Sequence, residues 1–225
     1  MSQQVSMELV KQLRTRTGAG IVDCRNALAE AGGDEEEAVK IIQKKGLAKV
    51  AKKAGAIAAD GAIHAYIHPG SRLGVLLEVN CQTDFVARSE DFRAFVTELG
   101  MQIASMVPQF VRREEIGAKA IADQRELFAA QMAEEDQTSG KSRPAQVADK
   151  ILQGKIDKWM TESCLMEQIS VLDNETTIAR KADELSAKLG EKISIRRFTR
   201  LELGEGIEKK RDNLADEVAK TLAGA

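Results

Sequence analysis

The sequence predicts an α+β protein: an N-terminal three-helix unit, then an α/β core with a small antiparallel sheet and a projecting antiparallel helical hairpin. Three changes of pattern support this prediction. Apolar residues recur at helical spacing near the N-terminus, alternate with polar residues from Gly61, and return to helical spacing after residue 89. We place the boundaries at 1–54 for the helical unit, 55–203 for the core with its hairpin at about 114–161, and 204–225 for a C-terminal helical module.

The first two helices are indicated by apolar spacing and by glycine breaks. Apolar residues from Met7 to Leu13 share one helical face, and the TGAG stretch at 17–20 interrupts the pattern. A second helix begins at about Ile21 and stops at the glycine pair 32–33.

The third helix carries a start signal and a stop signal. Asp34 followed by Glu37 forms a capping box, which satisfies free backbone amides at a helix start. Lys44 and Lys45 complement the helix dipole in the last turn, and Gly46 can take the left-handed closing conformation. We therefore expect this helix to end at Gly46, before an Ala/Lys-rich joint to the core.

From Gly61 the period becomes that of a β-hairpin followed later by a third strand. An apolar and a polar set alternate along a strand at 62–68: Ile63, Ala65 and Ile67 against His64, Tyr66 and His68. After a turn, a strand at 73–81 places four apolar residues on one face: Val75, Leu77, Val79 and Cys81. A third strand is expected at 192–203. The two histidines have no cysteine or carboxylate nearby to complete a ligand set, so no metal site is predicted.

The stretch NCQTDFVAR, residues 80–88, places the bulky Phe85 beside the charged Asp84 where the second strand gives way to a helix. Ser89 is the expected cap of that helix, whose apolar face would cover the sheet. The residues alone leave two interpretations open. Either Phe85 packs beneath the helix while Asp84 caps it, or Phe85 is held out for a partner.

The second half of the core is mainly helical. A polar helix from about 114 to 137 and another from 145 to 161 flank the breaker-rich stretch SGKSRP, which makes them an antiparallel hairpin. The Gly-Lys-Ser in this stretch is not a phosphate-binding loop, because that motif needs a glycine where Glu135 stands. We expect a further helix at about 174–189 and a terminal helix within 204–225.

The composition excludes several functional classes. Thirty-three basic and 35 acidic residues give a net charge of −2 with no long block of one sign, so nucleic acid binding is not expected. Cys24, Cys81 and Cys164 are widely spaced and suit reduced thiols in a cytoplasmic protein. No stretch is apolar enough to span a membrane, and two histidines with scattered acids assemble no catalytic set. We expect no enzyme, no cofactor and no direct nucleotide binding.

Four long stretches resemble bacterial translation elongation factor Ts, in order and across nearly the whole chain. They are VKQLRTRTGAGIVDCRNALAEAGGDEEEAVKIIQKKG, AKVAKKAGAIAADG, LLEVNCQTDFVAR and FTRLELGEGIEKKRDNLADEVAK. The resemblance implies a guanine nucleotide exchange factor that binds elongation factor Tu, GDP-bound and nucleotide-free, and supports translation elongation. It also implies that the N-terminal unit is similar to ubiquitin-associated domains. The rival interpretation is an adaptor of that type, which binds without promoting exchange.

The resemblance also implies roles for two segments. In that family the motif matched here by Thr83, Asp84, Phe85 and Val86 presses on the nucleotide domain of elongation factor Tu, where the aromatic ring disturbs the Mg²⁺ site that clamps the phosphates. The turn of the N-terminal unit is the expected docking surface for the same partner. It comprises Arg14, Thr17, Gly18, Ala19, Gly20, Ile21 and Val22.

Two departures from that family concern the core. Longer members have a second α/β subdomain, of which this chain carries no second hairpin copy, and many relatives have a histidine where Gln102 stands. A sheet this small has an exposed edge, so we expect a non-covalent homodimer about a two-fold axis. In the alternative, the helical hairpin and the C-terminal helix fold back over the sheet and complete a monomer.

Overall fold

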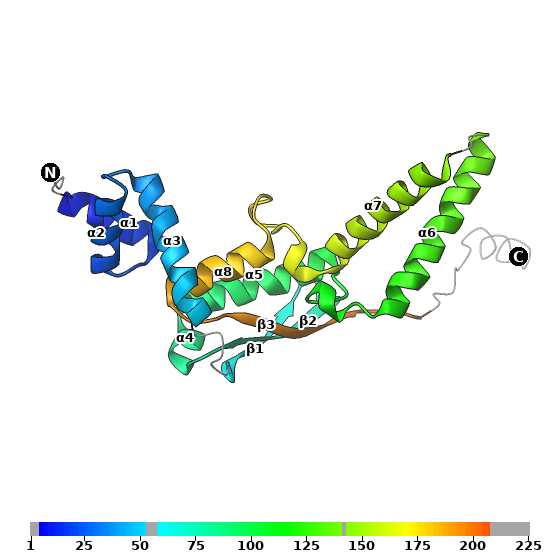
Figure 1. The fold of residues 1–225 in the computed structure, drawn as a ribbon. Coiled ribbons are helices and arrows are strands. Elements are labelled where there is room, and N and C mark those ends of the chain that lie inside the picture. The colour runs from blue at the N-terminus through cyan, green and yellow to red at the C-terminus, as the bar shows by residue number, and fades with distance from the viewer. Residues whose placement is uncertain (1–4, 53–57, 141–142, 208–225) are drawn as a thin grey trace, which may run out of the picture.

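The computed structural model describes residues 5–52, 58–140 and 143–207, and it has the predicted α+β architecture (Figure 1). The predicted C-terminal helix lies outside these residues from position 208 onward. The elements are α1 (Met7–Thr17), α2 (Ile21–Glu30), α3 (Glu35–Lys52), β1 (Asp60–Ile67), β2 (Leu73–Cys81), α4 (Asp84–Arg88), α5 (Glu90–Met106), α6 (Ala118–Ser139), α7 (Ala145–Ser163), α8 (Ile178–Leu189) and β3 (Ser194–Glu202), with short 3-10 turns at Arg113–Glu115 and Leu165–Glu167.

The sheet is antiparallel with strand order β1-β2-β3, so β1 and β3 are its edges. In the register, Tyr66 pairs with Val75, and Leu77 pairs with both His64 and Phe198. Helices α5 and α8 lie over one face of the sheet (Figure 1). The main core forms between these layers and includes Val75, Leu77, Val79, Cys81, Phe92, Phe95, Val96, Leu99, Ile103, Ile178 and Ile195.

The helices cover the more polar face of β1 and leave its apolar face exposed. Ala62 and Tyr66 pack against the core, whereas Ile63 is 70% and Ile67 is 61% exposed. A helical glycine accounts for the close approach of α5 to this strand. A Cβ atom at Gly100 would lie 2.6 Å from the Cβ of Tyr66, so a larger residue would push the helix away from β1.

The N-terminal helices have a separate buried cluster of Val10, Leu13, Cys24, Ala27, Leu28 and Ala38. The capping signal at Asp34 is confirmed, because its carboxylate accepts a hydrogen bond from the Glu37 N–H at 2.9 Å. The prediction that Gly46 closes the third helix is wrong, since α3 continues to Lys52. Gly46 instead lies against α8, where a Cβ atom would come within 2.7 Å of the Cβ of Ala187.

Helices α6 and α7 form the predicted hairpin, which projects from the end of the core opposite to α1–α3 (Figure 1). Helix α6 starts later than predicted because residues 113–115 form a 3-10 turn, and the Glu115 carboxylate accepts from the Val111 N–H at 2.9 Å. Helix α8 also starts late. Asn174 adopts a left-handed conformation with φ of 58°, and Thr177 caps the helix by accepting from the Arg180 N–H.

Candidate partner-binding site

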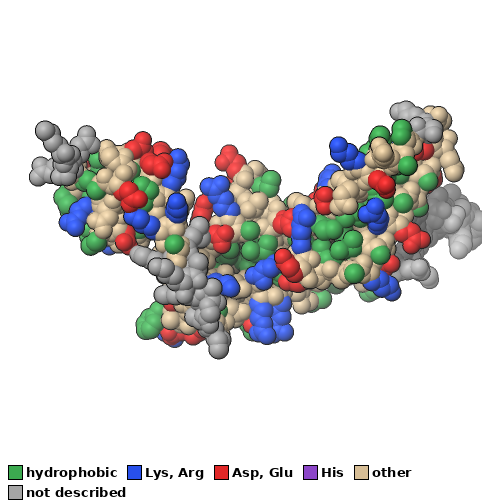
Figure 2. Space-filling view, viewed as in Figure 1, with side chains coloured by type: hydrophobic (Ala, Val, Ile, Leu, Met, Phe, Trp, Pro, Cys, Tyr) green, Lys and Arg blue, Asp and Glu red, His purple; other side chains and the backbone are tan. Residues whose placement is uncertain are grey.

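Phe85 lies on α4, the short helix that follows β2, and its side chain is 81% exposed. The interpretation in which this ring packs beneath the next helix is therefore wrong, and the cap of α5 is Ser89, which accepts from the Phe92 N–H at 3.3 Å. Asp84 pairs with Arg88 at 2.8 Å on the same helix. Figure 2 shows hydrophobic side chains on the surface at the α4 end of the molecule.

The other face of α4 attaches it to the core. Val86 and Ala87 are partly buried against the main hydrophobic cluster. Thr83 is the N-cap of α4, with its side-chain oxygen accepting from the Val86 N–H at 3.5 Å. Its carbonyl oxygen accepts from the Cys81 Sγ at 3.1 Å and from the Ala87 N–H at 3.3 Å. The other three motif residues are half-buried, so Phe85 is the exposed one and projects from an anchored turn.

A residue distant in sequence completes this anchor. The Glu191 carboxylate accepts from the N–H groups of Gln82 and Thr83 at 3.0 and 3.1 Å, and from the Thr83 hydroxyl at 2.8 Å. Sequence patterns missed Glu191, since it follows α8 and lies 108 positions after Thr83. Burial and the nearby Glu191 charge raise the pKa of Cys81, so its thiol stays a protonated donor and not a nucleophile.

The turn between α1 and α2 contains the second predicted segment. Gly18 ends α1 in a left-handed conformation with φ of 67°, and its N–H donates to the Arg14 carbonyl at 2.8 Å. The Thr17 hydroxyl accepts from the Ala19 N–H at 3.3 Å, which fixes the turn. Beyond the N-cap Gly20, α2 presents two exposed apolar side chains, Ile21 at 48% and Val22 at 60%.

A cleft of about 550 Å³ lies between this turn and helices α5 and α8. Thr17 and Ala19 line it from the turn, and Asp91 and Lys188, paired at 2.7 Å, line it from the core. In Figure 1, α4 and the α1–α3 unit both lie at the end of the molecule away from the α6–α7 hairpin. The two predicted segments therefore lie near one end, where the Lys188 side chain lies against Gly18 of the turn and pairs with Asp91 in the first turn of α5.

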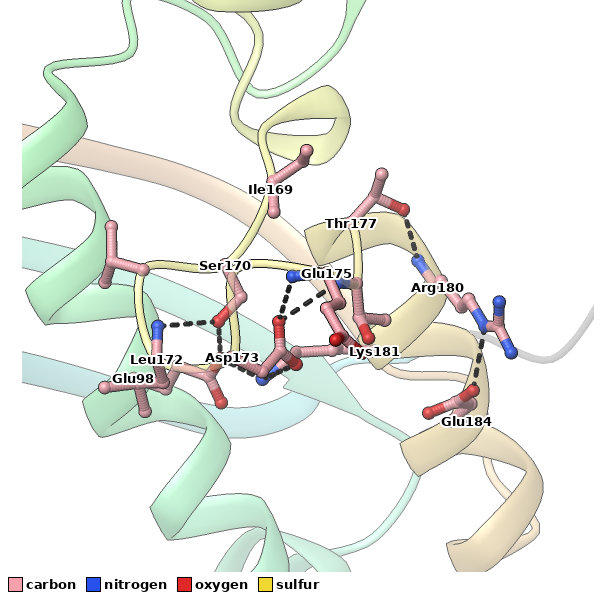
Figure 3. Close-up of polar contacts among 12 residues, drawn as sticks. Glu98, Ile169, Ser170, Leu172, Asp173, Glu175, Thr177, Arg180, Lys181 and Glu184 are labelled. Carbon is pink, nitrogen blue, oxygen red and sulfur yellow. Dashed lines mark hydrogen bonds and ion pairs between the residues drawn. The ribbon is translucent and has the colours of Figure 1, made fainter.

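The loop before α8 is held by a polar network (Figure 3). The Asp173 carboxylate accepts from the N–H groups of Glu175 and Thr176, both at 3.0 Å, and pairs with Lys181 at 3.0 Å. Lys181 also binds Glu98, which accepts from the Ser170 hydroxyl at 2.6 Å. The loop exposes two apolar side chains, Ile169 at 50% and Leu172 at 57%, which sequence patterns did not single out.

Gln102, on α5, stabilises the same loop from the protein interior. Its side chain is fully buried, donates to the Gln168 side chain and the Ile169 carbonyl at 3.1 Å each, and accepts from the Val171 N–H at 2.8 Å. Gln102 therefore contacts its own chain and is not exposed to a partner in this arrangement.

Two negative findings apply to the described residues. Within 5–52, 58–140 and 143–207, no group of three or more histidines, cysteines or acids is placed to hold a metal ion. His68 instead shares a hydrogen bond of 3.0 Å with the Tyr66 hydroxyl. In the same part of the chain, no helix has the length and apolar character needed to cross a membrane.

Comparison with known proteins gives a family. A family model described as elongation factor TS matches residues 8–205. Elongation factor Ts of Desulforamulus reducens is 48% identical over 219 residues, which cover 97% of this chain and 98% of that protein. Elongation factor Ts of Carboxydothermus hydrogenoformans is 46% identical over 218 residues, with 97% and 98% covered, and that of Anaeromyxobacter sp. strain K is 48% identical over 217 residues, with 96% of each covered. Because these matches run almost end to end, the chain belongs to the elongation factor Ts family.

Proposed function

We propose that this chain is a guanine nucleotide exchange factor that binds elongation factor Tu–GDP and promotes GDP release in translation elongation. The observation that carries the proposal is the exposed ring of Phe85 on an anchored helix, in a chain of this family. An apolar ring held in solvent by a rigid turn fits a partner contact, because folding of this chain gains little from it.

The proposed mechanism is a wedge. Phe85 enters the nucleotide domain of elongation factor Tu, with Thr83, Asp84 and Val86 setting its position, and displaces ligands of the Mg²⁺ ion that clamps the phosphates. Burial of one aromatic ring supplies about 2 kcal/mol. Mg²⁺ demands near-ideal octahedral geometry, so a small shift of its ligands weakens its binding. The chain itself need not contact GDP.

The exchange has no intrinsic direction. If the chain weakens GDP binding to elongation factor Tu by some factor, GDP weakens binding of the chain by the same factor, because both equilibria share one thermodynamic cycle. The partner is therefore bound in its GDP and nucleotide-free states, and the excess of GTP over GDP drives the cycle forward. Such a role places the chain in the cytoplasm.

We further propose that residues 1–54 dock on the same partner through the turn from Arg14 to Val22. The exposed Ile21 and Val22 supply apolar contact, and the turn geometry at Thr17 and Gly18 keeps them in place. Residues 55–203 then carry the wedge, and 204–225 form a separate C-terminal module.

The test is the release of fluorescent GDP from purified elongation factor Tu, followed by stopped flow with and without this chain. Acceleration that saturates with chain concentration supports exchange. Binding without acceleration, seen by titration calorimetry, would support the adaptor interpretation instead. We expect no GTP turnover by the chain alone, since its Gly-Lys-Ser stretch lacks the first glycine of a phosphate loop.

A further inference from the structure

Glu191 makes a concentrated set of contacts with the base of α4. The residue is only 9% exposed, and three donors from Gln82 and Thr83 converge on its two carboxylate oxygens within 3.1 Å. Hydrogen bonds to a charged acceptor are stronger than neutral ones, and a buried carboxylate needs several donors to offset its lost hydration. Within the described residues, no Lys or Arg forms an ion pair with Glu191, so these three hydrogen bonds are what satisfies its carboxylate.

The contacts bear on α4 because this helix is too short to hold its own orientation. It spans five residues, whereas isolated helices shorter than about 12 residues are marginal in water. Its direction therefore depends on its N-cap, Thr83, and on the packing of Val86 and Ala87. The Thr83 hydroxyl donates to Glu191 and accepts from the Val86 N–H, so Glu191 orients the capping group itself.

We infer that Glu191 is a positioning residue for Phe85: it locks the Gln82–Thr83 backbone and the Thr83 hydroxyl, and thereby sets the direction in which the exposed ring points. This inference rests on the proposed exchange function and adds to it a residue that follows Thr83 by 108 positions in the sequence. Glu191 lies in the connection between α8 and β3, so it links α4 to the end of α8. Helix α8 in turn contacts Gly46 of α3.

A positioning role predicts a particular pattern of kinetics. Glu191→Ala frees the Thr83 hydroxyl and two N–H groups, so the ring samples many directions and the maximum rate of GDP release, at saturating chain, falls by about tenfold. Glu191→Gln keeps one acceptor oxygen for the two N–H groups, so it should lower the maximum rate of GDP release less than Glu191→Ala does. Glu162→Gln removes the same charge from an exposed pair with Lys158 on α7 and serves as the matched control with unchanged exchange.

Two measurements separate positioning from a general loss of structure. Rates are compared at a temperature below the onset of the melting transition of every variant, so that each is fully folded. The rate of GDP release from elongation factor Tu should be no lower with the double variant Phe85→Ala, Glu191→Ala than with Phe85→Ala alone, because Glu191 acts through that ring. The inference would be overturned if the double variant slowed GDP release by the product of the two single effects. It would also be overturned if the rate with Glu191→Ala equalled that with the unmodified chain.

Hydrogen exchange of the free chain gives a readout that does not need elongation factor Tu. Glu191→Ala should speed exchange of the 82–88 amides while the amides of α5 and β2 stay protected. If the unmodified chain fails to accelerate GDP release from elongation factor Tu, the proposed function fails. Hydrogen exchange of the 82–88 amides then still decides whether Glu191 fixes this segment. Unchanged protection of 82–88 in Glu191→Ala would refute the positioning role whatever the GDP result.

Discussion

At the scale of single residues, Phe85 and Phe92 show how the same side chain serves two purposes in neighbouring elements. Phe92 on α5 is fully buried in the main core, whereas Phe85 on α4 is 81% exposed. Truncating a buried phenylalanine typically costs about 3–5 kcal/mol of stability, from lost burial and the cavity left behind. An exposed ring contributes little of this, which is why we propose that Phe85 serves a contact with a partner.

Phe85→Ala should therefore leave the free energy of unfolding within about 0.5 kcal/mol of that of the unmodified chain and slow GDP release from elongation factor Tu by at least about tenfold. Urea unfolding and stopped-flow release measure the two effects. Asp84→Ala should slow release less, because its pair with Arg88 is solvent-exposed. The matched control is Leu127→Ala on α6, also exposed, which should alter neither quantity. An equal rate of GDP release from elongation factor Tu with folded Phe85→Ala and with the unmodified chain would refute the wedge mechanism.

Glu78 gives a prediction about pH. Hydrogen bonds from Arg196 and then Arg197, both at 2.7 Å, lower the pKa of this carboxyl on β2 to about 2. Because the folded pKa lies below the ordinary value of 4.5, this stabilisation is complete above about pH 4.5 and is lost as the pH falls through about 2. The stability gap between the unmodified chain and Glu78→Gln, from urea unfolding, should thus shrink from about pH 7 to about pH 3. A gap that is constant over this range would contradict the assignment.

Sequence patterns located residues whose signal is local. Phe85 stood out because a bulky ring follows an acid at a strand end, and Asp34 and Ser89 because a capping side chain lies next to the backbone amides it satisfies. Glu191 gave no signal, since its partners are 108 and 109 positions away. The proposed roles of the Arg14–Val22 turn and of Phe85 come from a family resemblance and stay predictions.

At the scale of elements, the starts of α3 and α5 could be predicted, whereas the starts of α6 and α8 and the end of α3 could not. A start depends on a cap within the same turn, whereas Gly46 satisfies every local rule for a helix end and yet lies inside α3. Tertiary packing explains the difference. The missing side chain lets α3 approach Ala187 of α8, so this glycine is selected by contact between two helices and not by backbone conformation.

Two glycines test this explanation. Gly154, inside α7, has no heavy atom within 4 Å of the position that a Cβ atom would take, so Gly154→Ala should raise the free energy of unfolding by about 0.5–1 kcal/mol through helix propensity. Gly46→Ala should not, because its Cβ would meet Ala187 backbone and side-chain atoms at 2.7–3.0 Å and force α3 from α8. Urea unfolding and hydrogen exchange in α8 measure both effects. Equal stabilisation by the two substitutions would show that α3 and α8 are not in close contact.

At the scale of the whole molecule, the described residues cover the sheet on one side. Helices α5 and α8 pack on one face, and the α6–α7 hairpin projects away from the sheet (Figure 1). The C-terminal helix, which the monomer alternative also places over the sheet, lies outside the described residues. The opposite face keeps four large apolar side chains exposed within the described residues: Ile63 at 70%, Ile67 at 61%, Leu76 at 52% and Leu201 at 69%. The register places Leu201 opposite Gly74 and Ile67 opposite the same residue, so these side chains gather on one surface.

We propose that a second copy of the chain covers this apolar face about a two-fold axis, because burial of each such side chain is worth about 1.5–3 kcal/mol. Light scattering at micromolar concentration should give the mass of two chains, against 24.5 kDa for one. The mass should not depend on reductant, since all three cysteines are free and buried. Ile67→Lys should yield single chains, whereas Leu127→Lys, at an exposed apolar position on α6, should not. A single-chain mass for the unmodified protein would mean that the face has no partner copy.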